Sequence, residues 1–448
     1  MLHFMKTNFR NLFVSALLLA LPLMTLGQQP DIGYFRTPDK GGLNVFETFL
    51  ADTVPFDGFR VRVGGNFTQQ MQMLSHSNEA NVREVQGTNV NALYPLSSGF
   101  NLATANLNFD VQLGDGIRMS LESYMSSRHH PEFWVKGGYI QFDKLSMLDN
   151  PQWFEDYVSV RIGHMMFNYG DQHFRRSDNG RTFYNPFVGN YIMDAFTTEI
   201  GGEVYVFPSS KYFMMLGVSG GLIAGDVRDY GETDKSPSVI AKVGFDDQVS
   251  DDLRFRLTAS MYTNPGTTRN TLYAGDRAGS RYYMAMEPEF YQNFRAGGIV
   301  QASDAANRFT SGRLSPDFTH QVTSFIVQPF IKYRGLEFFG AYEVSTGTHN
   351  ANVDDRRATQ FAGEVVYRFA RNEQFYVGAR YNQVKAELSG PNGDVSVDRL
   401  QFALGWFTTQ NMLVKLEYVN QRFNDFDPND YRHGGEFSGL MIEAAIAF

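Results

Sequence analysis

Apolar and polar residues alternate along residues 59–73, whose sequence is FRVRVGGNFTQQMQM. The odd positions are mostly apolar and the even positions are mostly polar, so the two kinds of side chain point to opposite faces of a strand. A strand of this length is longer than most strands of soluble proteins. The pattern therefore predicts a long strand with one apolar face and one polar face.

The same alternation returns along the rest of the chain. Runs at 103–113 and 117–122 flank Gly114-Asp115-Gly116, and Asp-Gly between two alternating runs is a hairpin signal. Together with residues 59–73 and thirteen further runs, they predict sixteen strands; the further runs are 134–144, 157–169, 197–207, 212–224, 238–246, 252–263, 322–334, 335–346, 359–369, 375–388, 397–408, 412–422 and 437–448. An alternative adds Tyr282–Met286 and Ile299–Val300, which would make eighteen strands.

The connections between these runs alternate between short and long. Short turns such as 208–211 and 409–411 alternate with long loops such as 75–99 and 264–321. In a soluble sandwich the apolar face looks inward and the loops need not sort by length. Long strands, an even count and sorted loops predict an all-β fold: a transmembrane antiparallel β-barrel whose polar face lines its interior.

The N-terminus has the features of an export signal, because two basic residues precede an apolar run that ends at Leu26. A membrane anchor is the alternative, but the run is short for a bilayer span. We therefore predict a signal peptide at 1–27. Residues 28–57 are irregular and are predicted to be a periplasmic lead-in or a partial plug, and residues 58–448 are predicted to form the barrel.

One connection, residues 170–196, differs from the others in composition. It combines Gly, Asp, Asn and Pro with Arg175, Arg176 and Arg181, and aromatic residues are interleaved among them. A long loop in a compact chain is usually functional or disordered, and the aromatic content favours an ordered loop. We expect it to fold inward and to narrow the interior of the barrel.

Two stretches carry a family resemblance. The alternating last strand, FSGLMIEAAIAF, ends in Phe448 and resembles the terminal signal of Gram-negative outer-membrane barrels. The stretch RIGHMMFNYGDQHFRRSDNG, Arg161–Gly180, resembles the strand and following loop of phosphate-selective porin O/P-like proteins. The resemblance implies a porin in the cell outer membrane, surrounded by outer-membrane lipid and assembled as a homotrimer, through which small hydrophilic solutes diffuse. The lysine-rich binding clusters of those porins are not evident here, so we do not carry over phosphate as the ligand.

Charge narrows the possible solutes and partners. The formal net charge of -9 argues against nucleic-acid binding, because no basic stripe is present to neutralise phosphates. Arginine has a fixed charge and a planar fork, so an arginine-lined constriction favours anionic solutes. The bland alternative is that each arginine pairs with a wall carboxylate such as Asp110, Glu122, Glu199 or Glu203. The pore candidates are Arg60, Arg62, Arg118, Arg161, Arg254 and Arg256 on strands and Arg175, Arg176 and Arg181 in the loop.

Other function classes find little support. The chain has no Cys and no G-x-S-x-G motif, so we predict no enzyme activity, no metal centre and no cofactor. His129-His130 with Glu132 is interpreted as a solvated loop. The oxygen donors Asp425, Asp427, Asn429 and Asp430 leave a structural Ca²⁺ site open as an alternative. The alternative function is a structural or secretion-associated barrel that binds partner proteins through long external loops, above all 264–321.

Overall fold

The computed structural model describes residues 30–33, 35–48, 54–101, 103–126, 133–222, 227, 235–273, 281–293, 298–301, 312–351 and 353–448. The predicted signal peptide, residues 1–27, lies outside the described residues. The pair His129-His130 and Glu132 also lies outside them.

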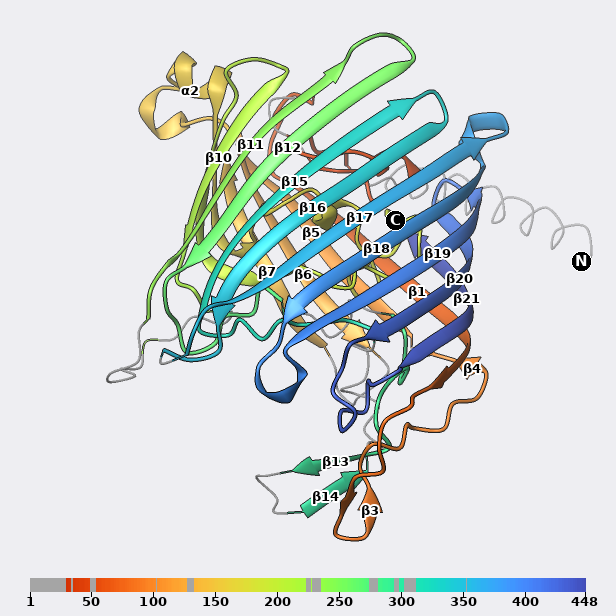
Figure 1. Cartoon of the computed structure of the whole chain (residues 1–448). Helices are drawn as coiled ribbons and strands as arrows, with labels where there is room; N and C mark the ends of the chain where they lie inside the picture. Colours follow the sequence, from red (N-terminus) through yellow and green to blue (C-terminus); the bar gives the residue numbers. More distant parts are fainter. Residues whose placement is uncertain are drawn as a thin grey trace, which may run out of the picture.

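Sixteen long antiparallel strands form a closed barrel, and a short extra strand, β4 (Gly99–Phe100), pairs with β1 (Figure 1). The ring closes where β1 pairs with β21, for example at Asn66 opposite Ala447. This confirms the predicted fold and strand count. The barrel strands are β1 (Arg60–Ser77), β5 (Thr104–Gly114), β6 (Ile117–Ser126), β7 (Phe133–Phe142), β8 (Val158–Met166), β9 (Thr198–Val206), β10 (Tyr212–Ser219), β11 (Ser238–Gln248), β12 (Leu253–Asn264), β15 (Gln321–Tyr333), β16 (Leu336–Thr348), β17 (Arg356–Phe369), β18 (Phe375–Glu387), β19 (Asp394–Thr409), β20 (Met412–Asn424) and β21 (Glu436–Ala447).

The alternative of eighteen strands is wrong. Tyr282–Met286 is not a strand: Met284 and Met286 have positive φ angles, which an extended strand does not allow. The side chain of Tyr282 is fully buried in the barrel interior, where its hydroxyl donates to Glu417. Ile299 and Val300 belong to β14 (Gly298–Gln301), which pairs with β13 (Phe290–Asn293) in a separate hairpin. Neither segment joins the barrel ladder.

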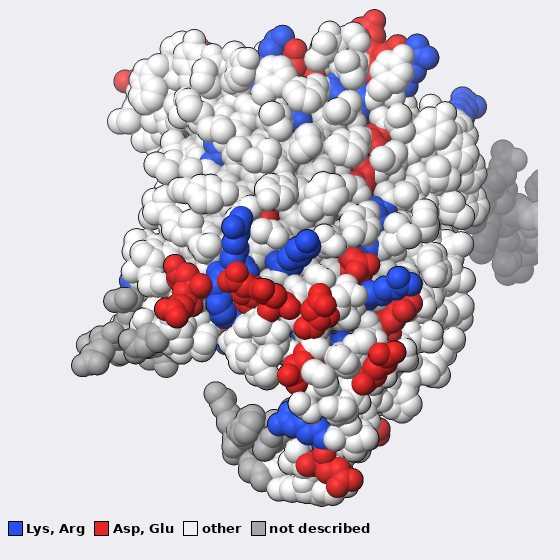
Figure 2. Space-filling model, viewed as in Figure 1, with Lys and Arg blue, Asp and Glu red and all other residues white. Residues whose placement is uncertain are grey.

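The two faces of the strands follow the alternation of the sequence. In β10 the exposed residues Tyr212, Met214, Leu216 and Val218 alternate with buried ones. On β1 the polar side chains of Asn66, Thr68, Gln70 and Gln72 are buried instead, because they face the interior. Figure 2 shows a broad, largely uncharged belt across the outer face, with charged side chains gathered toward its two ends. An outward apolar belt around a polar interior is the arrangement of a membrane-spanning barrel.

The two ends of the barrel differ. The short turns lie at the end that carries helix α2 (Gln152–Tyr157), whereas two hairpins project at the other end (Figure 1). Among the described residues, no helix has the length and apolar character needed to cross a membrane. The projecting hairpins are β2 (Glu84–Val85) with β3 (Thr88–Asn89) and β13 with β14. The 3-10 helices within the described ranges are η1 (Lys40–Gly42), η2 (Ser146–Leu148), η3 (Gln172–Phe174), η5 (Arg371–Glu373) and η6 (Gly390–Asn392).

Candidate functional site

Residues 167–197, which connect β8 to β9, lie inside the barrel, and we call them the plug loop. The side chains of Phe187, Val188 and Ile192 are fully buried. The chain turns inward at Gly170, where φ is +72° and a Cβ would lie 2.0 Å from the Gln172 side chain. Glycine suits this position, because an L side chain would meet a strained φ and would displace the end of the Gln172 side chain. The sequence predicted a loop that narrows the interior, and the observed loop fills one side of it.

Asp171 anchors the start of the plug loop to the barrel wall. Its carboxylate accepts hydrogen bonds from Arg256 at 2.8 Å, from Lys242 at 2.7 Å and from Thr258 at 2.9 Å. Burial by itself would raise the pKa of Asp171, but Arg256 and Lys242 outweigh burial and hold the pKa well below its ordinary value. The carboxylate is therefore ionised and fully paired at neutral pH.

The two loop arginines that follow also form buried ion pairs. Arg175 reaches Glu364 on β17 at 2.8 Å and Glu337 on β16 at 3.5 Å. Arg176 stays within the loop and binds Asp194 at 2.6 Å. Such pairs stabilise only when both charges stay partnered, so both arginines hold the loop in place.

The backbone of the plug loop is satisfied by side chains of the barrel wall. Lys415 on β20 donates to three loop carbonyls, those of Thr182, Asn185 and Phe187, at 2.9–3.1 Å. Glu417, the next residue on the same inward face, accepts from the Val188 N–H at 2.7 Å. A buried loop needs such partners, since it has no strand neighbour to satisfy its backbone.

The segment before β1 enters the same space. Glu47 pairs with Arg256 at 2.7 Å and with Lys242 at 3.1 Å, so it joins the Asp171 cluster. Phe46 packs edge-on against Phe174 of the plug loop, with ring centroids 5.6 Å apart. Residues 35–48, which we call the lead-in, thus contact both the plug loop and the inner wall of the barrel.

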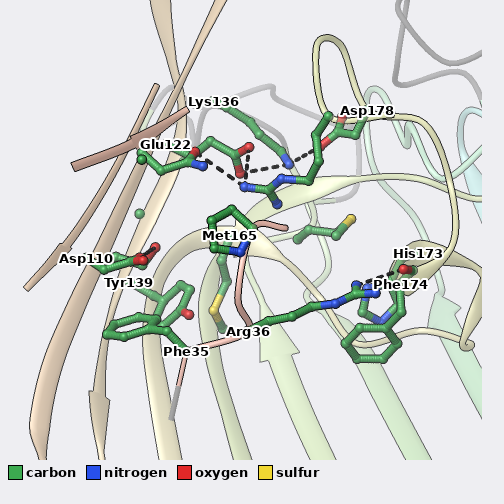
Figure 3. A pocket seen from close by; sticks show the side chains of 18 of the residues that line it. Phe35, Arg36, Asp110, Glu122, Lys136, Tyr139, Met165, His173, Phe174 and Asp178 are labelled. Carbon is green, nitrogen blue, oxygen red and sulfur yellow. Dashed lines mark hydrogen bonds and ion pairs between the residues drawn. The ribbon is translucent and has the colours of Figure 1, made fainter. Parts of the chain in front are cut away.

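A cavity of about 230 Å³ remains between the plug loop, the lead-in and the inner wall of β1 and β5–β8 (Figure 3). We call this wall the open side of the lumen and the wall of β11, β12 and β15–β20 the packed side. Six basic side chains line the cavity against three acidic ones. They are Arg36, Lys136, Arg62, Arg161, Arg176 and Arg181 against Asp110, Glu122 and Asp178.

Two ion pairs of the open side are more exposed than the pair that Arg175 forms with Glu364 on the packed side. Arg62 pairs with Asp110 at 2.7 Å, and their side chains are 16% and 18% exposed. Arg181 pairs with Glu122 at 2.9 Å and is 29% exposed. In Figure 3, Lys136 lies between Glu122 and Asp178 and bridges the two carboxylates. Water can reach Arg62, Asp110 and Arg181, so a solute in the cavity meets the electric field of these charges.

The cavity brings together four of the nine predicted arginines, namely Arg62, Arg161, Arg176 and Arg181. The other five lie outside it. Arg60 pairs with Asp57 outside the cavity, Arg118 pairs with Asp143, and Arg254 pairs with Asp246. Arg175 and Arg256 hold the plug loop, as described above. The alternative in which each arginine pairs with a carboxylate therefore accounts for most of them. A role for any of the nine in solute passage stays a prediction.

The sequence analysis did not identify several basic side chains that face the barrel interior. Lys242, Arg380, Arg399 and Lys415 are all buried inside the barrel. The same alternation that identified Arg254 would have identified Lys415, which lies between Val414 and Leu416. Arg36 gave no such signal, because the lead-in has no period.

The cation-site alternative has no support among the described residues, in which no group of three or more His, Asp or Glu side chains is placed to hold a metal ion. Asp430 binds Arg432 at 2.7 Å instead, and Asp427 accepts from the Asn429 backbone at 2.8 Å.

Comparison with known proteins informs the fold. No family model matches the sequence, and no curated protein matches it either. An anion-selective porin from Comamonas acidovorans has a similar structure, with a TM-score of 0.51 at 8% identity, over 87% of this chain and 100% of that chain. OprB from Pseudomonas putida gives a TM-score of 0.49 at 10% identity over 87% and 94%, and Salmonella typhi OmpF gives 0.49 at 11% over 88% and 99%. At such a low identity, the similarity to the Comamonas porin shows only that this chain has the same barrel fold.

Proposed function

We propose that this protein is an outer-membrane porin of low conductance that favours small anionic solutes. The observation that carries the proposal is the excess of six basic over three acidic side chains around the cavity of the open side. The chain as a whole has a net charge of -9, so this local excess runs against the overall composition. A lumen that presents arginines to water attracts anions and repels cations.

The route follows from the packing of the interior. The plug loop closes the packed side, where Arg175 and Glu364 are 3% and 1% exposed. Solutes therefore pass along the open side, between Arg62 and Arg181, both of which line the cavity. The protein carries out no chemistry in this proposal, and passage follows the concentration gradient of the solute.

Single-channel recording in planar bilayers tests the proposal. The refolded protein should give steady, small currents, and its reversal potential in a salt gradient should show anion preference. Arg181→Ala should lower that preference by about twofold to threefold, because one cavity charge is lost. Arg254→Ala is the matched control: Arg254 is also paired with a carboxylate and partly exposed, but it lies outside the cavity.

Two results would contradict the proposal. Equal anion preference in the wild type and in Arg181→Ala would show that solutes do not pass through the cavity. Electrically silent barrels would favour the alternative, in which the hairpins β2–β3 and β13–β14 beyond the barrel rim bind a partner protein (Figure 1). The expected homotrimer stays a prediction, which chemical crosslinking of the purified protein checks.

A further inference from the structure

Arg36 differs in its partners from Arg62, Arg176 and Arg181, three other arginines that line the cavity. Its Nε donates to the Gly42 carbonyl at 2.7 Å and its Nη1 donates to the Phe174 carbonyl at 2.8 Å. Its guanidinium lies over the Tyr184 ring, 3.5 Å from the centroid. Among the described residues, Nη2 has no hydrogen-bond partner, and no carboxylate forms an ion pair with this arginine.

The contrast with its neighbours is direct. Arg62, Arg181 and Arg176 each have a carboxylate within 3.3 Å. Arg36 is held by two neutral carbonyls and a ring, so its charge has no counter-ion among the described residues. Removing a charge from water without a counter-ion is unfavourable, and an anion that enters the cavity relieves this penalty.

The surroundings of Arg36 add positive charge. Burial lowers the pKa of Arg36, as do the nearby guanidiniums of Arg181 and Arg175, while Tyr184 raises it, and the result is about 10. Arg36 therefore keeps its charge at neutral pH. Arg62 and Arg181 line the same cavity as Arg36 and Tyr184.

We propose that Arg36, brought into the lumen by the lead-in, binds the carboxylate or phosphate group of a solute through its Nη2, with Arg181 and Arg62 adding attraction. This inference rests on the proposed function and names its ligand chemistry, a small oxyanion. A planar guanidinium whose buried Nη2 has no hydrogen-bond partner among the described residues suits such a group. Phe35, Tyr139 and Phe174 also line the cavity, so a short organic acid finds apolar contact beside the charge.

Titration of the refolded full chain in phosphate-free detergent tests the site. The probes are inorganic phosphate and acetate, followed by calorimetry and, for phosphate, by ³¹P line broadening. Arg36→Gln should weaken binding of both probes at least about tenfold, since it removes the only unpaired charge described at the site. Arg36→Lys keeps the charge but loses the planar fork, so its affinity should fall between the two.

Arg60→Gln is the matched control. Arg60 also donates to a carbonyl of the N-terminal segment, that of Asp31 at 2.7 Å, and its loss changes the net charge equally. It does not line the cavity, so its affinity should stay within about twofold of the wild type. Band mobility with and without heating, in detergent gels, shows that each variant still folds.

The outcomes separate this site from the channel. Equal affinity in the wild type, Arg36→Gln and Arg60→Gln, or no binding of either probe by the wild type, would overturn the Arg36 site. A conducting barrel with that result would leave the porin proposal standing. Binding that depends on Arg36 in a barrel that passes no current would support the site and contradict the porin.

Discussion

The packed and open sides of the lumen use the same residue types in different ways. On the packed side, Arg175 and Glu364 are almost fully buried and join the plug loop to β17. On the open side, Arg62 and Asp110 form an equally short pair, but both side chains keep contact with water. Both are arginine–carboxylate pairs, and only their access to water differs.

Access to water decides what such a pair does. In a dry interior, losing one partner leaves a buried charge, so the pair acts as a structural tie. In contact with water, the pair contributes little stability and remains a field for solutes. The difference between these two pairs thus follows the path of the plug loop, which covers Arg175 and Glu364 but leaves Arg62 and Asp110 in contact with water.

Deleting the plug loop should abolish the difference between the two sides. Replacing residues 172–195 with a short Gly-Ser linker removes the contacts that these residues make with the packed side, such as the ion pair between Arg175 and Glu364. The single-channel conductance should rise by about tenfold or more, because a sixteen-stranded barrel without its plug leaves a water-filled channel. Planar-bilayer recording measures the change.

The control for this deletion is a test that the shortened chain still folds into a barrel. The barrel ladder closes without help from the loop, so the shift in gel mobility on heating should persist. A folded barrel with unchanged conductance would show that the plug loop does not close the packed side.

Removing a single anchor should weaken the packed side strongly. Asp171→Ala leaves Arg256 and Lys242 with only part of their counter-charge, chiefly that of Glu47. The free energy of unfolding should fall by about 3–5 kcal/mol, the usual result of breaking a buried pair. Urea titration followed by tryptophan fluorescence measures the loss, and a loss below that of an exposed pair would contradict the structural role.

The contribution of Asp171 to the free energy of unfolding should be lost only at low pH. The folded pKa of Asp171 is depressed, so its contribution is complete above the unfolded pKa of about 3.9 and declines as pH falls toward the folded pKa. The stability difference between wild type and Asp171→Ala should be equal at pH 7 and pH 5 and should shrink below about pH 4. Urea midpoints at pH 7, 5 and 3 test this, and a difference that already shrinks at pH 5 would contradict the depressed pKa.

The same truncation on the open side should have the smallest effect on stability. Asp110→Ala removes the partner of Arg62, but water can solvate the arginine that remains. The expected loss is about 1 kcal/mol or less, while anion preference should rise slightly because Arg62 loses its counter-charge. The urea titration and the reversal potential read these two effects separately. A loss of unfolding free energy as large as that of Asp171→Ala would contradict the proposed difference between exposed and buried ion pairs.

The barrel was predictable because its pattern is local. Alternation along a strand requires only that one face meets lipid and the other meets the lumen, and β10 follows this rule at every residue. The eighteen-strand alternative failed at Tyr282–Met286, since a short apolar run does not reveal whether it pairs with a strand or packs inside the barrel.

The site was predictable only in part because it depends on contacts between distant segments. Arg62 and Arg181 were identified from a polar face and from loop composition, but nothing near them in sequence shows that they share a cavity. Arg175 and Arg181 come from the same loop, yet one is buried in ion pairs and the other lines the cavity. Arg36 lies in an irregular segment, so only the folded chain shows that it reaches the same space.

The path of the plug loop has a consequence for how the chain tolerates change. Loops usually accept substitutions and insertions, whereas interior positions do not. Here the outward positions of the strands, such as Leu216 and Val218, need only an apolar side chain, while Gly180 of the plug loop lies so close to β5 that a Cβ would be 2.5 Å from the Ala105 Cα. A library covering every position should find its least replaceable residues in a segment that strand-based reasoning treats as a connection.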